Sequence, residues 1–366
     1  MKILFIVPYP KDVAPSQRLK FEQYFTHFKA NGIEIEFSPF ISTAFRKILY
    51  ERGHYLKKCW YVIQGYARRV KDIFRSRHFD IIYLHLEVAP FGPPVFEQIF
   101  HMMKKPIVYD IDDVIYLPHS SDANKSTQFL KCAGKIPEII RLSSHVIVVT
   151  DYLAEFARRF NANITCIPPT VDTDKYFIKN KGPGGKICVG WSGSHSTSKY
   201  LLLLKDVLKN IAGRYDVRIK VIGDKNFRIE GLDIEAKDWS MDAEVEDLQD
   251  IDIGLYPLPK DEWVMGKGGL KALQYMGIGI PPVCTRIGAV LRFIKDGENG
   301  FLAESDEEWM DKITKLIENP GLRKRMGFAA RNTIEENYSV KVNAPRYLEV
   351  IKKVQLLTKS GKMRLH

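Results

Sequence analysis

Cysteine is scarce in this sequence, with five residues among 366. The five are odd in number, lie far apart and never form a CxxC pair: Cys59, Cys132, Cys166, Cys188 and Cys284. A disulfide framework needs an even, clustered set, and a thiolate zinc site needs closely spaced pairs. The cysteine pattern therefore excludes both kinds of site and indicates a protein of a reducing compartment.

Long hydrophobic runs are also absent. No apolar stretch approaches the ~20 residues that a membrane-spanning helix needs. The first ten residues, MKILFIVPYP, hold one lysine and an apolar run that ends at Pro8, which is too short for the core of a signal peptide. We therefore expect a cytoplasmic protein that can lie on the inner face of the plasma membrane but does not cross it.

Two common nucleotide-binding motifs are missing as well. The chain has no GxxxxGK[ST] segment, which excludes a P-loop enzyme. No GxGxxG follows the first predicted strand, and this argues against a nicotinamide dehydrogenase.

Positive charge, in contrast, is plentiful and uneven. The chain has 55 Lys and Arg against 44 Asp and Glu, a net charge of +11. Residues 44–78 hold ten basic and two acidic side chains, so this segment carries +8 of the excess. Such an excess indicates an anionic partner: nucleic acid, a phosphorylated small molecule or an acidic membrane surface. The charge is confined largely to one segment, and no RNA- or DNA-binding module is recognisable in the sequence. We therefore expect no nucleic-acid partner.

The basic segment 44–78 has the pattern of an amphipathic helix. Its apolar residues recur at helical spacing at Val62, Tyr66, Val70, Ile73 and Phe74. The basic residues that fall largely off that stripe are Arg68, Arg69, Lys71 and Arg75. Such a helix suits the headgroup layer of an anionic membrane surface. The alternative is a surface helix whose apolar stripe packs on its own domain and whose charges are solvated.

Strands alternate with helices along both halves of the chain. The apolar segments that predict strands are Ile3–Val7, Ile33–Phe37, Asp80–Leu84, Ile107–Ile111, Val146–Val149, Ile187–Trp191, Val217–Ile222, Leu232–Ala236, Ile253–Tyr256 and Pro282–Cys284. A helical pattern runs from Leu19 to Phe28 and ends at Asn31-Gly32. The alternation predicts an α/β protein with two doubly wound, Rossmann-like parallel sheets and a cleft at the junction of the halves. A Pro-, Gly- and charge-rich stretch at 171–185 predicts the linker between them.

The densest glycine cluster precedes a predicted helix. The loop and the first helical residue are Gly266, Gly268, Gly269 and Leu270. A glycine loop that opens a helix directs N–H groups and the positive end of the helix dipole at one point, which makes an anion site. Lys267 and Lys271, four residues apart, add two charges on one face of the first turn. We interpret the segment as a phosphate-binding site; the alternative is a glycine-rich turn with two solvated lysines.

The segment from 266 to 302 resembles the donor-binding signature of family 4 glycosyltransferases. That signature is a Glu, seven residues, a second Glu, then A-M-A-x-G-x-P-V, and later G-x-x-G-[FL]-L. Its matches in this chain are Met276, Gly279, Pro281, Val283, Gly297, Gly300, Phe301 and Leu302. Two further family features appear in the right order, IPPTVDTDKY before the linker and GWSGSHSTSKYL at the first strand of the second half. The resemblance covers nearly the whole chain.

The resemblance implies the GT-B fold, in which two Rossmann-like domains face each other across a cleft. It implies an acceptor domain at 1–170 with the basic insertion 44–78, the linker 171–185, a nucleotide-sugar donor domain at 186–337 and a helix at 338–366 that crosses back. The implied reaction moves a sugar, with retention of anomeric configuration, from a nucleoside diphosphate donor to a glycan or lipid-linked acceptor in surface polysaccharide or glycolipid synthesis. It implies no metal and no other cofactor.

This chain departs from the family pattern at the two signature glutamates, which fall on Gly266 and Gln274. Gln274 can still bond ribose hydroxyls through its amide, whereas Gly266 offers only backbone. The Arg and Lys that usually grip the diphosphate are missing, with Ser194 standing nearby. The chain resembles a branch that reads K-x-x-x-K-x-x-Q-Y-M, which implies that Lys267 and Lys271 replace them as the catalytic cations. The alternative is a non-catalytic nucleotide-sugar binder or scaffold.

The same resemblance implies roles for residues in other loops. Ser16 and Arg18 follow the first strand, where the anionic donor approaches. Asp112 stands where family members carry a histidine, and we interpret it as a ligand of sugar hydroxyls rather than of a metal. Glu87 can serve the acceptor hydroxyl as base or hydrogen-bond acceptor. The remaining donor-binding candidates are Asp224, Trp239 and Ser240. The alternatives are structural: a helix-start serine, a solvated arginine, a surface carboxylate and a packing tryptophan.

Overall fold

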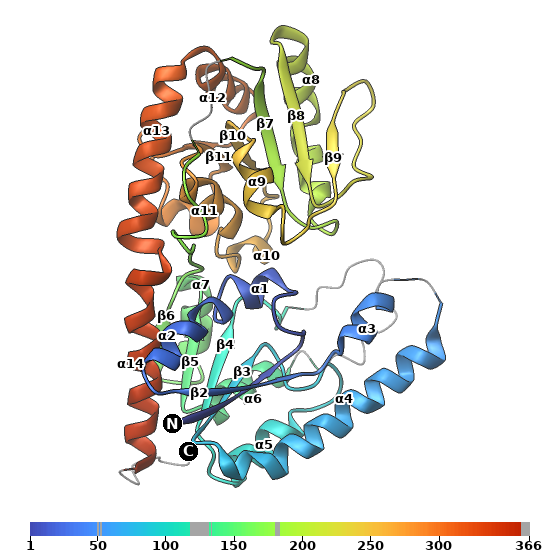
Figure 1. Cartoon of the computed structure of the whole chain (residues 1–366), viewed down its shortest axis with the longest axis vertical. Coiled ribbons are helices and arrows are strands. Elements are labelled where there is room, and N and C mark those ends of the chain that lie inside the picture. The colour runs from blue at the N-terminus through green and yellow to red at the C-terminus, as the bar shows by residue number, and fades with distance from the viewer. Residues whose placement is uncertain (50, 52, 118–131, 133, 180–183, 360–366) are drawn as a thin grey trace. The chain divides into compact units, whose positions relative to one another are not determined.

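The chain forms two compact units in the computed structural model (Figure 1). The first unit comprises Met1–Pro168 with Asn343–His366, and the second comprises Pro169–Val342. The structure describes residues 1–366 except 50, 52, 118–131, 133, 180–183 and 360–366, and no side chain at 358 or 359. Parts of the predicted segments 44–78, 171–185 and 338–366 thus lie outside the described residues. Within the described part of the chain, no helix has the length and apolar character to span a bilayer.

A six-stranded parallel sheet forms the centre of the first unit, in the strand order β2-β1-β3-β4-β5-β6 (Figure 1). The strands are β1 (Lys2–Val7), β2 (Glu34–Pro39), β3 (Ile81–His85), β4 (Ile107–Ile111), β5 (His145–Val148) and β6 (Ile164–Cys166). β3 and β4 are buried along their whole length, and β1 is buried after its first residue. Burial on both faces is typical of parallel strands covered by helices on each side. The predicted doubly wound sheet is confirmed.

Helices and helical turns connect these strands. They are α1 (Pro15–Arg18), η1 (Glu22–Tyr24), α2 (Phe25–Ala30), α3 (Thr43–Ile48), α4 (Tyr55–Arg75), η2 (Ser76–His78), α5 (Val95–Met102), α6 (Lys135–Leu142) and α7 (Asp151–Arg158). Two of them begin at capping side chains, because the hydroxyls of Ser42 and Thr150 accept backbone N–H groups in the first turns of α3 and α7. A last helix, α14 (Val340–Lys359), starts in the second unit and continues in the first.

The helical pattern predicted from Leu19 to Phe28 is confirmed only in part. Its end at Asn31 is correct, but the segment consists of the separate elements α1, η1 and α2. The buried Gln17 holds this broken arrangement. Its amide accepts from the backbone N–H of Tyr9, donates to the carbonyl of Tyr9, and donates to the carboxylate of Glu22. These bonds tie the chain beyond α1 to the loop that follows β1.

α4 follows α3 in the connection from β2 to β3, and its fully buried residues are Gly65, Arg69 and Asp72, while the half-buried Tyr66 packs on Phe40. A Cβ at Gly65 would lie 2.6 Å from the ring of Phe40, so the helix approaches its neighbours closely there. The fully buried Arg69 pairs with Asp72 at 2.9 Å and donates to the carbonyls of three residues, Val7, Ser38 and Val88. Burial lowers the pKa of Arg69 to about 10, with Asp72 opposing that shift. The prediction that Arg69 belongs to a charged outer face is therefore wrong.

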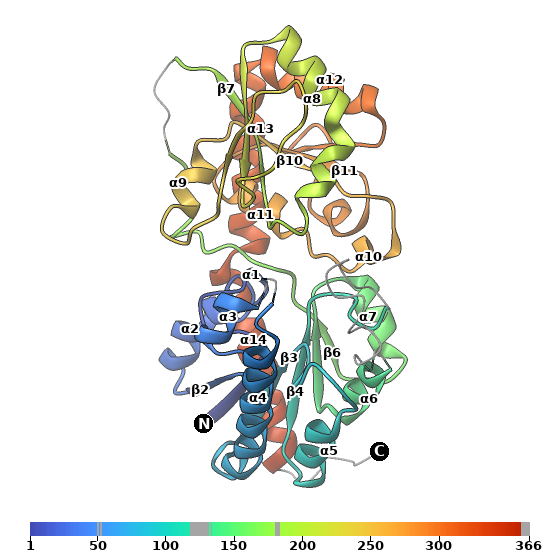
Figure 2. The ribbon, with the colours of Figure 1, turned by 90° about the vertical axis from the view of Figure 1, so that its right-hand side faces the viewer.

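The second unit contains another six-stranded parallel sheet, in the order β12-β11-β10-β7-β8-β9. Its strands are β7 (Ile187–Ser192), β8 (Val217–Ile222), β9 (Glu235–Lys237), β10 (Ile253–Tyr256), β11 (Pro282–Thr285) and β12 (Phe301–Ala303). Its helices and turns are η4 (Ser198–Leu204), α8 (Lys205–Arg214), α9 (Glu244–Gln249), α10 (Glu262–Met265), α11 (Leu270–Gly277), η5 (Gly288–Arg292), α12 (Asp306–Glu318), α13 (Pro320–Thr333) and η6 (Ile334–Tyr338). α8 and α12 pack together (Figure 2). A buried cluster that includes Trp191, Leu208, Val221 and Trp309 forms the core.

Candidate functional site

The glycine loop of the second unit opens a helix, as the sequence predicts. α10 ends at Gly266, and the loop turns into α11 at Gly269, whose φ of +75° lies in the left-handed region. A Cβ at Gly269 would also lie 2.7 Å from the ring of Phe293, so this position requires glycine on two counts. Leu270 is then the first residue of α11, and the N–H groups of this first turn have no partner within the helix.

Lys271 reaches back from α11 toward the loop that follows β7. Its Nζ donates to Oγ1 of Thr197 at 3.0 Å and lies 4.3 Å from the centre of the Trp191 ring. Lys267, in the glycine loop, lies with its Nζ 5.7 Å from the ring of Trp263. Burial and the positive charge of Lys267 lower the pKa of the Lys271 ammonium to about 7. Among the described residues, no carboxylate pairs with Lys271.

The loop after β7 is shaped around this lysine. A Cβ at Gly193 would lie 2.4 Å from Nζ of Lys271 and 2.3 Å from the Trp191 ring, so a larger residue would displace the ammonium. The Gly193 N–H donates to the carbonyl of Ile222 at the end of β8. Ser194 is exposed, and its backbone N–H and hydroxyl bond the hydroxyl of Thr197. The ends of two neighbouring strands and the start of α11 thus meet at one place.

Asp224 lies in the loop after β8 and is buried. It accepts a hydrogen bond from the hydroxyl of Ser198 at 2.6 Å, and Nδ1 of His195 lies 3.0 Å away. Burial acts to raise the pKa of Asp224, but the bonds from Ser198 and His195 outweigh burial and lower it. Asp224 therefore holds the β7 loop in place, and the exposed His195 ring is the part of this pair that a ligand can reach.

Gln274, one turn further along α11, belongs to a buried cluster around Glu244. Its Nε2 lies 3.2 Å from the hydroxyl of Tyr176 and 3.4 Å from Oε1 of Glu244. Tyr176 donates to Oε2 of the same carboxylate at 2.8 Å, and Trp239 donates its indole N–H to Oε1 at 3.2 Å. A carboxylate that only accepts fixes the amide of Gln274 with its nitrogen toward Glu244. The amide oxygen of Gln274 makes no hydrogen bond to any residue that the structure describes.

Trp239 and Gln274 were predicted from the sequence to bind the donor, but Glu244, the carboxylate that joins them, was not. Glu244 is one of several acids in the first turn of α9. Its burial together with Asp247 and Leu248, three and four residues on, is the helical pattern that could have marked it as inward-facing. Ser240, the neighbouring donor-binding candidate, is exposed, and its hydroxyl accepts from the N–H of Ala243 in the turn before α9.

The predicted residues of the first unit lie after β1, β3 and β4. Ser16 is half-buried in α1, and Arg18 at the end of α1 is buried, so Arg18 is not the solvated side chain of the alternative interpretation. Glu87 is 26% exposed and pairs with the buried Lys135 at 2.7 Å. Asp112 is 15% exposed, with Oδ1 3.9 Å from Nε2 of His85.

The three aspartates of the YDIDD segment do different things. Asp110 is fully buried, forms an ion pair with the buried Lys20, and accepts from the hydroxyl of Tyr83 at 2.6 Å. Asp113 accepts the backbone N–H of Val114. Asp110 and Asp112 both lie beside His85, 3.8 and 3.9 Å from its ring nitrogens, but only Asp112 is partly exposed. Burial lowers the pKa of the His85 ring to about 3. No group of three or more potential metal ligands occurs among the described residues.

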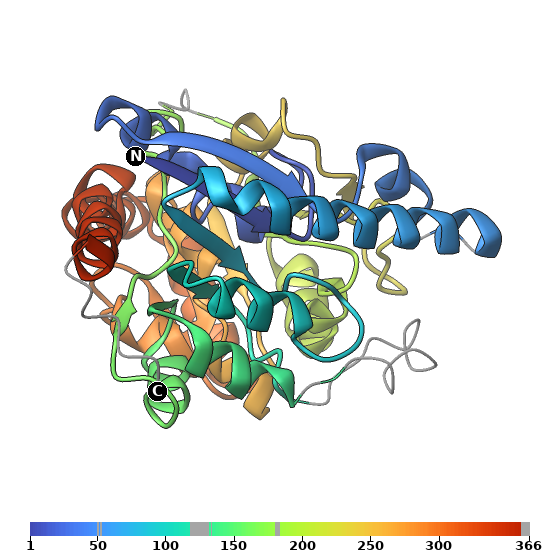
Figure 3. The same ribbon diagram turned by 90° about the horizontal axis from the view of Figure 1, so that it is seen from below.

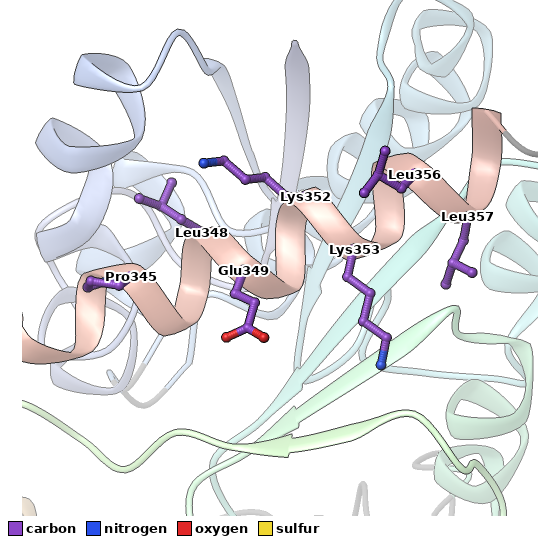
Figure 4. A pocket seen from close by; sticks show the side chains of 7 residues that line it. All are labelled: Pro345, Leu348, Glu349, Lys352, Lys353, Leu356 and Leu357. Carbon is purple, nitrogen blue, oxygen red and sulfur yellow. The ribbon is translucent and has the colours of Figure 1, made fainter.

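A groove of about 770 Å³ runs along α14 in the first unit (Figure 4). Seven side chains of that helix line it: Pro345, Leu348, Glu349, Lys352, Lys353, Leu356 and Leu357. None of them is a predicted site residue. The groove therefore adds nothing to the candidate site, whose residues come from the loops at the carboxyl ends of the strands.

The second unit is similar to a known protein family. Residues 172–333 match the family model described as "Glycosyl transferases group 1", and this range contains the glycine loop, α11 and Glu244. The chain is 23% identical over 176 residues to a trehalose synthase of Pyrococcus horikoshii, covering 48% of this chain and 38% of that one. It is 28% identical over 97 residues to N-acetyl-alpha-D-glucosaminyl L-malate synthase of Bacillus anthracis, covering 26% of each. The aligned part is thus well under half the length of these curated relatives.

Solved structures resemble the chain over almost its whole length. A glycosyltransferase of Rickettsia africae matches with a TM-score of 0.70 at 15% identity, covering 96% of this chain and 98% of that one. HepE of Anabaena, in complex with UDP-glucose, matches with a TM-score of 0.69 at 16% identity, covering 96% of this chain and 100% of that one. Similarity at this level of identity shows the fold, and the fold is GT-B, as the sequence predicts.

Proposed function

We propose that the chain is a group 1 glycosyltransferase that takes its sugar from a nucleoside diphosphate sugar. The observation that carries the proposal is the pair Lys267 and Lys271 at the N-terminus of α11. Burial and the charge of Lys267 both disfavour the charged form of Lys271, and an anion bound beside Lys271 offsets both effects. A diphosphate supplies that anion and also accepts from the N–H groups of the glycine loop. The HepE structure, which holds UDP-glucose in the same fold, fits this proposal.

The proposed mechanism is transfer with retention of anomeric configuration by front-face substitution. As the bond from the sugar to the diphosphate breaks, negative charge develops on the leaving diphosphate. Lys267, Lys271 and the α11 N–H groups stabilise this charge, and the diphosphate takes up the proton of the acceptor hydroxyl. Two side-chain cations and a helix terminus supply the charge stabilisation, so the proposed mechanism requires no metal.

We further propose that Gln274 and Glu244 together replace the missing signature glutamates. The oxygen of the Gln274 amide can accept a ribose hydroxyl while its nitrogen is held by Glu244 and Tyr176. Gly266, at the position of the other glutamate, can contribute only backbone.

For the first unit we propose acceptor recognition, with a glycan or a lipid-linked sugar as the acceptor in surface polysaccharide or glycolipid synthesis. Asp112 is partly exposed and can bond sugar hydroxyls. Glu87 is held by Lys135, and the pairing favours a role as hydrogen-bond acceptor over one as base. A membrane-bound acceptor implies that the protein works at the cytoplasmic face of a membrane.

A specific observation also supports a second candidate, a nucleotide-sugar binder without transferase activity. Gly266 removes a side chain that family members use on the donor sugar, so binding could persist where transfer is lost.

A donor screen separates the two candidates. The protein is heated with each of several nucleotide sugars, and the donor that raises Tm is then followed for hydrolysis and transfer. Binding with turnover supports the transferase, and binding without turnover supports the binder. If no nucleotide or nucleotide sugar raises Tm, both proposals are wrong.

A further inference from the structure

A line of large apolar side chains is exposed along α4. The exposed fractions are 89% for Leu56, 59% for Trp60, 57% for Ile63, 47% for Val70 and 61% for Phe74. Their spacing of three, four and seven residues places all five on one face of the helix. Single exposed apolar residues are ordinary on soluble proteins, whereas a continuous patch marks an interaction surface. We call this set the α4 apolar face.

The opposite side of α4 is buried, and its contacts hold the α4 apolar face toward solvent. Gly65, Arg69 and Asp72 are buried there, and the hydrogen bonds of Arg69 prevent the helix from rotating to hide its apolar side. The face extends from Leu56 to Phe74, which is about 27 Å at 1.5 Å per residue. α4 runs along one side of the first unit, and its N-terminal half extends beyond the sheet (Figure 3).

Positive charge lines one edge of the α4 apolar face. Lys57 and Lys71 are exposed and lie on one line of the helix with Gln64, at seven-residue spacing. Neither lysine forms an ion pair with any residue that the structure describes. By contrast, Arg68 donates to the carbonyls of Pro39 and Phe40, and Arg75 pairs with Glu36 and Asp72. The cations that a partner can reach are therefore the lysines.

We propose that the α4 apolar face lies in the headgroup layer of an anionic lipid bilayer. Apolar side chains of the face enter the boundary with the acyl chains, with Trp60 among them, while Lys57 and Lys71 extend to the lipid phosphates. The length, the unbroken apolar line and the basic edge are the features of a helix that lies in the plane of a membrane. The proposal does not depend on the transfer reaction, and it goes beyond that reaction by naming the surface on which the protein works.

A second copy of this chain fits the same face less well. Two copies related by a twofold axis would bring the same basic segment of each chain together, because an isologous contact is made by one patch on both sides. Residues 44–78 carry ten basic and two acidic side chains, so such a contact would place like charges together. An anionic lipid surface complements that charge.

Vesicle flotation tests the proposal. Vesicles of phosphatidylcholine mixed with phosphatidylglycerol are compared with vesicles of pure phosphatidylcholine, and binding is expected only to the anionic set. The variant Lys57→Gln/Lys71→Gln is expected to bind roughly fivefold more weakly for each charge removed. The variant Trp60→Ser/Ile63→Ser is expected to lose roughly 10- to 100-fold. Neither change alters a buried residue, so both variants should keep the far-UV circular dichroism of the parent protein.

Two matched controls lie in the second unit. Phe328→Ser removes an apolar side chain that is 63% exposed, and Lys205→Gln/Lys324→Gln removes two exposed lysines. Both are expected to float like the parent protein. The proposal is overturned if the parent does not float with anionic vesicles, or if Trp60→Ser/Ile63→Ser floats equally well.

Light scattering of the same samples tests the alternative that a second copy of this chain covers the α4 apolar face. A twofold increase in mass that Trp60→Ser/Ile63→Ser abolishes, together with no vesicle binding, would assign the face to a second copy. The thermal shift caused by the donor is measured on the same variants and should be unchanged. A protein that floats but responds to no nucleotide would refute the proposed function and leave the membrane proposal standing.

Discussion

At the scale of single residues, Lys271 is the side chain whose packing bears most directly on the proposed reaction. Its ammonium lies between the Trp191 ring and the hydroxyl of Thr197, and a pKa of about 7 leaves it partly deprotonated at neutral pH in the free protein. A diphosphate bound beside it favours the charged form. In the proposed mechanism, donor binding and proton uptake at this lysine are therefore coupled.

The first prediction concerns the pH dependence of UDP binding. Below about pH 7 Lys271 is already protonated, and its contribution to affinity is constant. Above that pH the free protein must take up a proton on binding, so affinity should fall about tenfold per pH unit. Isothermal calorimetry with UDP from about pH 7 to about pH 9 measures this slope, and Lys271→Met should flatten it. An equal slope in both proteins would contradict the coupling.

The same lysine should affect the pH dependence of stability. The unfolded chain keeps the Lys271 proton up to a pKa of about 10.4, whereas the folded chain loses it near 7. Between these values the unfolded state binds more protons, so the contribution of this group to the free energy of unfolding rises with pH. Denaturant titration of the free protein against Lys271→Met isolates that contribution, and a Lys271-dependent decrease with pH would contradict it.

Glu244 gives a third residue-scale prediction. Glu244→Ala removes the carboxylate that accepts from the buried Tyr176 and Gln274 and from the half-buried Trp239, which should lower the free energy of unfolding by about 2–3 kcal/mol. Glu246→Ala, an exposed acid on the same helix, should change it by less than about 0.5 kcal/mol. Urea titration of the two variants tests the contrast. Equal values for both would mean that the Glu244 cluster contributes little to the fold.

At the scale of elements, the presence of α4 could be predicted from the sequence, but the side that it buries could not. The sequence predicts an amphipathic helix there, and a helix is present. Which residues of the helix are exposed was predicted less well, because α4 has apolar residues on more than one side and its fully buried side chains, Arg69 and Asp72, are charged. Arg69 is buried because carbonyls from β1, β2 and the loop after β3 converge on it, and those partners are distant in sequence.

The fourth prediction tests that buried arginine. Arg69→Ala removes the buried cation of the Asp72 pair and leaves that carboxylate, among the described residues, only Arg75 and the Ser38 hydroxyl. This should lower the free energy of unfolding by about 3–5 kcal/mol. Arg77→Ala, at an exposed position just beyond α4, should change it by less than about 0.5 kcal/mol. Thermal or urea unfolding followed by circular dichroism measures both, and a similar small effect for Arg69→Ala would contradict the assigned packing.

At the scale of the whole molecule, most of the fold could be predicted from the sequence. The buried parallel strands are rich in apolar residues, and β4, β8 and β10 begin and end where the sequence predicts. The glycine loop of α11 was equally predictable, because glycine at a left-handed position leaves a local signature. Gln17 and Glu244 were not, because their importance comes from partners that only the folded chain brings near.

In the proposed mechanism, the cations beside the glycine loop stabilise the leaving diphosphate. The most direct measurement is the turnover of Lys267→Ala with the donor that raises Tm, compared with Lys324→Ala on the exposed side of α13. We predict that Lys267→Ala folds normally and loses about 3 kcal/mol of transition-state stabilisation, roughly 100-fold in kcat, while Lys324→Ala is unchanged. Undiminished turnover in Lys267→Ala would contradict the claim.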